Sequence, residues 1–219
     1  MNVLFKAFAD ASLAISSCMS VALDLDENEL TSHCQDGESI SLMRLFHYLP
    51  YDAATGQPDE ASDGRIGSSP HTDWGWLTLI LQQADVVGLQ VYHEDQWWDV
   101  PPLKGAIATN IGDYIALLTR GRFHSPLHRV VTGPRDRTSW VFFSYPDYDA
   151  NIPLIGEEGA TAGGERTLSL LADQTVGAGA VSSDESGMNT AAVAPEDALQ
   201  GRAFGDFIRE KWASVSREV

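Results

Sequence analysis

The stretch that decides the fold is residues 71–145, which read HTDWGWLTLILQQADVVGLQVYHEDQWWDVPPLKGAIATNIGDYIALLTRGRFHSPLHRVVTGPRDRTSWVFFSY. Short apolar runs alternate there with turn residues, and seven stand out: WLTLILQ, VGLQVYH, QWWDV, GAIATNI, DYIALLT, PLHRVVT and TSWVFFSY. Many short β-forming runs separated by turns are typical of a sandwich or barrel. They leave little room for helices, which argues against a parallel α/β sheet. We therefore expect a mainly β fold.

The residues before this stretch predict a helix, a strand and a loop. Residues 1–23 carry apolar side chains at spacings of three and four, which indicates a helix packed on the core. That apolar face consists of Leu4, Phe8, Ala11, Ile15, Met19 and Ala22. Residues 41–48 (SLMRLFHY) predict a strand. The following segment to residue 70, rich in Gly, Ser, Pro and Asp, predicts a long loop of the kind that often carries function.

The residues after this stretch predict a mobile segment and a terminal helix. Residues 151–200 are poor in large apolar side chains, so we expect mobility there. The last residues place Phe204, Phe207, Ile208 and Trp212 on one helical face, which should dock on the domain. We therefore predict a single domain over 1–219, divided into helix and lead-in (1–40), β core (41–150), mobile segment (151–200) and C-terminal helix (201–219).

Composition limits the partners of the chain. With 219 residues, 43% of them hydrophobic, it can form one sizeable core. A net charge of −17, from 14 basic and 31 acidic residues, argues against nucleic-acid and anionic-membrane partners. The cysteines, Cys18 and Cys34, form no disulfide framework, and no stretch qualifies by inspection as a membrane span. We expect a cytoplasmic protein.

Three residues suggest a metal site. His71 and Asp73 stand two apart, and in a strand such side chains point to the same side. His128 lies in a later predicted strand, and two histidines with one carboxylate form the facial triad of non-haem iron oxygenases. A zinc site with the same three ligands is the chemical competitor. His124, four residues before His128, is expected at the surface.

Arg137 and Ser139 suggest an anion site. They also stand two apart in a predicted strand, so they share a face. A guanidinium with a hydroxyl beside it suits a carboxylate. The alternative is a surface arginine at a strand start, because Arg135, Asp136 and Arg137 form a polar turn.

Taken together, HTDWGWLTLILQ, VGLQVY, WWDVPPLKGAIATNIGDYIALLTRGRFHSPLHRVV and RTSWVFFSYP resemble the isopenicillin N synthase-like branch of the iron(II)/2-oxoglutarate oxygenases. The resemblance runs from about Leu42 to Tyr148. It implies a double-stranded β-helix, or jelly roll, with flanking N- and C-terminal helices. It also implies His71, Asp73 and His128 as iron ligands, and Arg137 with Ser139 as partners of the distal carboxylate of 2-oxoglutarate. Tyr48 could add a hydroxyl there, although His47-Tyr48-Leu49-Pro50 departs from the family's Asn-x-Tyr motif.

The resemblance implies an oxidoreductase, a dioxygenase that uses Fe(II), 2-oxoglutarate and O2, with ascorbate as a candidate reductant. It would hydroxylate, desaturate or cyclise a small organic molecule, as in secondary metabolism, and release succinate and CO2. Relatives usually carry a further N-terminal region, and a missing layer would expose apolar surface that favours self-association or a partner. Two alternatives remain: an iron oxidase of the same fold that does not use 2-oxoglutarate, and a non-catalytic remnant that binds metal or a partner.

Overall fold

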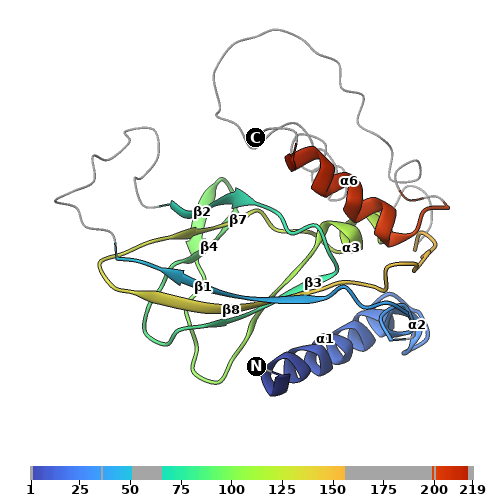
Figure 1. Cartoon of the computed structure of the whole chain (residues 1–219), viewed down its shortest axis with the longest axis horizontal. Coiled ribbons are helices and arrows are strands. Elements are labelled where there is room, and N and C mark those ends of the chain that lie inside the picture. The colour runs from blue at the N-terminus through green and yellow to red at the C-terminus, as the bar shows by residue number, and fades with distance from the viewer. Residues whose placement is uncertain (1, 36, 51–65, 156–198, 200, 217–219) are drawn as a thin grey trace, which may run out of the picture.

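The computed structural model describes residues 2–35, 37–50, 66–155, 199 and 201–216, and its core is two antiparallel sheets that face each other (Figure 1). The major sheet has the order β1 (Leu42–Tyr48), β8 (Arg137–Ser144), β3 (Leu77–Gln82) and β6 (Ala108–Ile111). The minor sheet has the order β2 (Ile66–His71), β7 (His128–Val131), β4 (Leu89–His93) and β5 (Gln96–Asp99). This architecture confirms the predicted mainly β jelly roll. The predicted division of 1–219 into segments stays a prediction.

Strand β8 organises the major sheet. It pairs along most of its length with β1 on one side and β3 on the other. Its residues Arg137, Ser139 and Val141 are buried in alternation, because successive side chains of a strand point to opposite faces. One face of β8 therefore carries polar and apolar side chains into the space between the sheets.

Helix α1 (Asn2–Ala22) covers the outer face of the major sheet, against β8 and β3 (Figure 1). Phe8 stacks on Phe142 with ring centroids 5.8 Å apart. The predicted helix is confirmed, with Phe8 and Met19 buried and Leu4, Ala11 and Ile15 partly buried against the core. Its buried face is wider than predicted: Ala22 is exposed, whereas Ser12, Ser16 and Ser20 are buried as well. Hydrophobic periodicity could not find these serines, because their hydroxyls are buried through hydrogen bonds.

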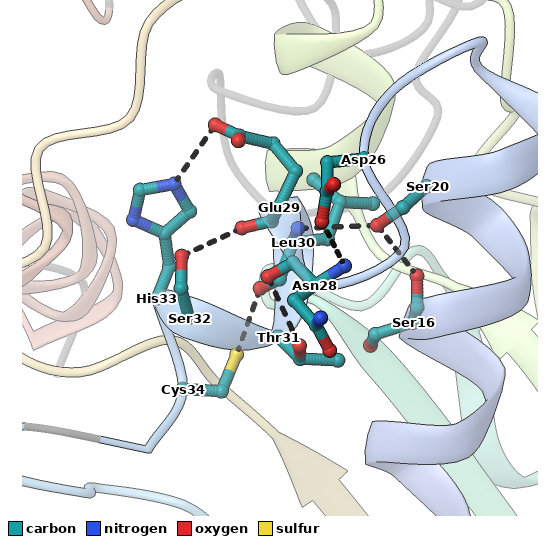
Figure 2. Close-up of polar contacts among 10 residues, drawn as sticks. All are labelled: Ser16, Ser20, Asp26, Asn28, Glu29, Leu30, Thr31, Ser32, His33 and Cys34. Atoms are coloured by element: carbon teal, nitrogen blue, oxygen red, sulfur yellow. Dashed lines mark hydrogen bonds and ion pairs between the residues drawn. The ribbon is translucent and has the colours of Figure 1, made fainter.

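Those hydroxyls join α1 to its neighbours. Ser16 Oγ accepts a 2.9 Å hydrogen bond from the buried indole of Trp76. Ser20 Oγ accepts one of 3.1 Å from the backbone N–H of Leu30 in α2 (Glu29–Ser32) and donates to the carbonyl of Ser16 (Figure 2). Buried polar groups are stable when paired in this way. The serines therefore set the position of α1 on the sheet and of α2 on α1.

The two cysteines are free thiols, as expected. Cys34 lies just after α2, with Sγ 3.8 Å from the carbonyl oxygen of Leu30 (Figure 2). Burial, together with the charge of Asp147, raises the pKa of the Cys34 thiol to about 12, so it stays protonated and unreactive at neutral pH.

The run DYIALLT is a helix rather than the predicted strand. It forms α3 (Asp113–Leu118), which buries Tyr114, Ile115 and Leu118 at helical spacing. Its first backbone N–H groups donate to the loop before β3: that of Asp113 to the carbonyl of Asp73 at 2.7 Å, and that of Tyr114 to the carbonyl of Gly75 at 3.1 Å. These tertiary hydrogen bonds fix a short helix that the local pattern did not reveal.

Helix α6 (Phe204–Ser216) docks beside α3 at one end of the sandwich (Figure 1). Phe204, Phe207 and Ile208 are buried, and Trp212, although 46% exposed, contacts the ring of Trp74 edge-on at 5.4 Å. The predicted docking is confirmed. Of the predicted mobile segment, residues 156–198 and 200 lie outside the described residues, as do residues 51–65 of the predicted loop. The end of that loop is strand β2, which corrects the prediction.

Helix α1 is long and apolar enough to cross a membrane, judged by length and composition alone. This corrects the expectation that the chain contains no such stretch. The core helix of a folded domain meets the same criterion, and α1 packs on the major sheet. The helix is therefore weak evidence for a membrane span.

Candidate active site

The structure brings His71, Asp73 and His128 together at the edge of the minor sheet. His71 ends β2 and His128 begins β7, and the two are direct partners in the antiparallel register. Their ring centroids are 4.3 Å apart. Asp73 lies beyond the end of β2, in the connection to β3, so the expectation that His71 and Asp73 share one strand is wrong. The hydrogen bond from Asp113 to its carbonyl holds that connection in place.

The side chains converge on one point. His71 Nε2 lies 3.7 Å from Asp73 Oδ1, and His128 Nε2 lies 3.6 Å from Asp73 Oδ2. One ligand atom from each residue can be chosen so that all lie within 4.8 Å of one another. Asp73 and His128 are buried, while the His71 side chain is 41% exposed. The cluster therefore has a solvent-accessible side.

Backbone carbonyls orient both imidazoles. His71 Nδ1 lies 2.7 Å from the carbonyl oxygen of Ser69, and His128 Nδ1 lies 3.1 Å from that of Pro126. A carbonyl only accepts, so each Nδ1 carries the proton and each Nε2 presents a lone pair to the cluster. Burial lowers the pKa of His128, with the neighbouring His71 acting in the same direction and Asp73 against it. A neutral imidazole is the form that binds metal.

Asn110 supports the cluster through Asp73, a role that its position in the sequence does not predict. It lies on β6, and its Nδ2 donates a 2.9 Å hydrogen bond to Asp73 Oδ2. Such outer contacts fix the direction in which a ligand carboxylate points. A polar amide inside the predicted strand GAIATNI was the available signal.

Arg137 and Ser139 lie on the inner face of β8, both 2% exposed. The surface alternative for Arg137 is therefore wrong. Its Nη2 donates to Gln82 Oε1 at 3.0 Å, while its Nε and Nη1 are buried without a hydrogen-bond partner among the described residues. Burial lowers the pKa of Arg137, and Tyr48 opposes that shift. A buried cation with unpaired N–H groups is costly, which fits an anion as the missing partner.

Tyr48 completes this end of the site. It is the register partner of Arg137 across β1 and β8, and the guanidinium lies 5.1 Å from the centroid of its ring. Burial raises the pKa of Tyr48, and the charge of Arg137 partly offsets that rise. The hydroxyl thus stays protonated at neutral pH and can donate a hydrogen bond.

One cavity between the sheets joins both groups. Its lining includes the three-residue cluster at one side, Tyr48, Arg137 and Ser139 at the other, and apolar residues such as Phe46 and Phe143 between them. The cavity measures about 50 Å³, several times the ~10–15 Å³ that one water needs. Gly88 lies against Arg137: a Cβ there would lie 2.8 Å from Arg137 Cδ and 2.9 Å from the carbonyl oxygen of Val131. Only glycine leaves the arginine its space.

The donor set suits a divalent metal with open positions. Two imidazoles and one carboxylate on one side of an ion leave room for a bidentate ligand and for O2, as in non-haem iron(II) sites. Zinc accepts the same donors, but it has no redox chemistry. The buried guanidinium in the same cavity adds a place for the far carboxylate of a dicarboxylic acid. His124 is exposed and is not part of the cluster.

Comparison with known proteins agrees with this chemistry. The family model described as 2OG-Fe(II) oxygenase superfamily matches residues 39–146. 1-Aminocyclopropane-1-carboxylate oxidase homolog 10 of Arabidopsis thaliana is 44% identical over 153 residues, which are 69% of this chain and 39% of that protein. The 2-oxoglutarate-dependent dioxygenase citB of Monascus ruber is 39% identical over 131 residues, 58% of this chain and 38% of that protein.

Among solved structures, the crystal structure of JOX2 in complex with 2OG, Fe and JA superposes with a TM-score of 0.60 and 28% identity. That match covers 72% of this chain and 44% of the other chain. The chain spans about two fifths of the length of the curated relatives it matches.

Proposed function

Because the chain belongs to the 2OG-Fe(II) oxygenase superfamily, we propose that it is an iron(II)- and 2-oxoglutarate-dependent dioxygenase that oxidises a small organic molecule. The observation that carries this proposal is the shared cavity. His71, Asp73 and His128 meet at one side of it, and the unpaired guanidinium of Arg137 lies at the other. A metal-chelating keto acid with a second carboxylate matches both ends.

In this proposal His71, Asp73 and His128 hold the iron, while Asn110 keeps the Asp73 carboxylate turned toward it. Arg137 binds the distal carboxylate of 2-oxoglutarate, and Ser139 and Tyr48 contribute hydroxyl hydrogen bonds. Iron with 2-oxoglutarate supplies the activation of O2, coupled to oxidative decarboxylation to succinate and CO2, that oxidises the substrate. The apolar residues that line the cavity would reduce the access of water to the reacting groups.

An oxidase of the same fold that does not use 2-oxoglutarate is less well supported. Such an enzyme has no need of a dicarboxylate, yet Arg137 keeps two buried guanidinium nitrogens, Nε and Nη1, without a hydrogen-bond partner among the described residues. The similarity to a 2-oxoglutarate-dependent dioxygenase also favours the co-substrate. Ascorbate as reductant, a cytoplasmic location, self-association and the absence of nucleic-acid and membrane partners remain predictions.

The test is succinate formation by the purified protein with iron(II), 2-oxoglutarate and O2. We expect production that needs iron and is lost in Arg137→Ala. Arg209→Ala removes a 72%-exposed guanidinium on α6 and serves as the matched control, with production unchanged. Equal production by the Arg137 and Arg209 variants would refute the role of Arg137. Folded, iron-loaded protein without any production would favour the non-catalytic remnant.

A further inference from the structure

Arg44 is a second cation on the face of β1 that looks toward the cavity; its side chain is exposed, outside the residues that line the cavity itself. Alternate residues of a strand share a face, and Phe46 and Tyr48 of β1 both line the cavity. Arg44 continues this inward series. Its register partner on β8 is Val141, which also lines the cavity. Arg44 thus lies beyond Phe46, at the end of β1 away from Tyr48 and Arg137.

A ring contact and the strand register together relate Arg44 to the metal cluster. Its guanidinium carbon lies 5.9 Å from the ring centroid of Phe143, another cavity residue. Phe143 is opposite Thr78 of β3, and Thr78 is opposite Asn110 of β6, which holds Asp73. Asn110 lies two strand spacings of about 4.8 Å from Phe143, and β1, which carries Arg44, is one strand further, so the span from β1 to β6 is on the order of 14 Å. That span suits a small molecule held at one end with a reacting carbon near the metal.

The charge of Arg44 also reaches the site through Tyr145. Burial raises the pKa of Tyr145 to about 12; the charge of Asp73 adds to the rise and that of Arg44 opposes it. One phenol therefore lies within electrostatic range of the metal cluster and of Arg44. This agrees with the placement from strand register.

The described residues offer Arg44 no anionic partner. Arg202 forms a 2.6 Å ion pair with Glu210, Arg209 one of 3.9 Å with Asp206, and Arg137 a hydrogen bond with Gln82. Arg44 has only the ring of Phe143, within the part of the chain that the structure describes. An arginine left without a carboxylate in a chain of net charge −17 is available for an anionic ligand.

We propose that Arg44 determines substrate specificity by binding a carboxylate of the prime substrate, whose apolar body packs on Phe143 and Phe46. The substrate class is then a small carboxylic acid with an apolar body, oxidised at a carbon several bonds from its carboxylate. This inference rests on the proposed function. It assigns to Arg44 a ligand different from that of Arg137, because the two arginines lie at opposite ends of the inward series.

The experiment uses matched pairs of carboxylic acids and their primary amides, such as 3-phenylpropanoic acid with 3-phenylpropanamide and octanoic acid with octanamide. Each is titrated anaerobically into the protein loaded with iron(II) and 2-oxoglutarate, and the shift of the visible charge-transfer band gives Kd. We expect an acid to bind at least about tenfold more tightly than its amide, because a charged hydrogen bond is lost in the amide.

Three variants make the test specific to Arg44. Arg44→Gln should remove the preference for the acid, Arg44→Lys should keep part of it, and the surface variant Arg209→Gln should keep all of it. The Kd for 2-oxoglutarate should be the same in all four proteins. A preference that survives Arg44→Gln, or equal binding of every acid and its amide, would overturn the inference while leaving the proposed function standing. Absence of the band itself would refute both.

Discussion

Replacing Gly88 with alanine tests whether Arg137 serves as an anion anchor. The added Cβ would lie 2.8 Å from Arg137 Cδ and 2.9 Å from both its Nε and the carbonyl oxygen of Val131. Real Cβ atoms essentially never approach that closely, so the arginine side chain must move, and the backbone contact between residues 88 and 131 must shift as well. Gly88 also accepts a 2.8 Å hydrogen bond from the backbone N–H of Val131, which limits how far its own backbone can retreat.

The size of the effect follows from overpacking. Forcing one extra methyl group into a filled space typically costs about 1–3 kcal/mol. If that cost destabilises the guanidinium position that binds 2-oxoglutarate, the Kd for 2-oxoglutarate rises about 5- to 150-fold. The iron Kd should change little, because no residue of the metal cluster is among the atoms nearest to the added Cβ.

The assay is calorimetric titration of 2-oxoglutarate into the anaerobic protein loaded with iron(II). Gly133→Ala is the matched control, because a Cβ at Gly133 would meet nothing within 4 Å. Thermal unfolding of both variants shows whether the folded state is kept. If Gly88→Ala binds 2-oxoglutarate as tightly as Gly133→Ala and the original protein, Arg137 does not anchor the co-substrate.

Three further predictions concern the residues around the metal cluster. Asn110→Ala removes the 2.9 Å donor to Asp73 and should weaken metal binding about 10- to 100-fold in a competition titration. Burial raises the pKa of Asp113 to about 6 from 3.8, so the native state holds that proton more tightly and stability is lost as pH rises from 4 to 6. In Asp113→Asn, the fall in the free energy of unfolding between pH 4 and 6, measured with urea, should be smaller by up to about 3 kcal/mol. An equal dependence of the unfolding free energy on pH in the two proteins would contradict this. Ser16→Ala leaves the buried indole N–H of Trp76 without its acceptor and should cost about 1–3 kcal/mol of unfolding free energy, whereas an unchanged urea midpoint would mean that the bond contributes nothing.

Much of the fold could be predicted from the sequence because local pattern and tertiary structure agree along β1, β3 and β8. The run Asp113–Leu118 could not, since its helix depends on hydrogen bonds to Asp73 and Gly75, residues that are distant in the chain. The serine face of α1 was hidden for a related reason. A serine counts as polar in a hydrophobicity pattern, and only the folded structure shows that the Ser16 hydroxyl is buried as the acceptor for the indole of Trp76.

The candidate site was predictable where spacing along the chain carries the information. His71, Asp73, His128, Arg137 and Ser139 were all named from spacing and resemblance, and they line one cavity. The residues that support them were not predictable, because an orienting contact depends on which side chains meet in space. The contacts of Asn110 with Asp73 and of Gln82 with Arg137 join strands whose pairing the sequence does not state.

The most direct test of the central claim is an anaerobic titration of 2-oxoglutarate into the iron(II)-loaded protein, followed by visible absorption. We expect a weak charge-transfer band that saturates at one equivalent of 2-oxoglutarate, because a keto acid would chelate the iron held by His71, Asp73 and His128. Asp73→Ala should abolish the band, while Asp206→Ala, a surface change on α6, should leave it intact. A folded, iron-loaded sample that shows no band, or a band of equal strength in Asp73→Ala, would show that these three residues do not hold an iron–2-oxoglutarate chelate.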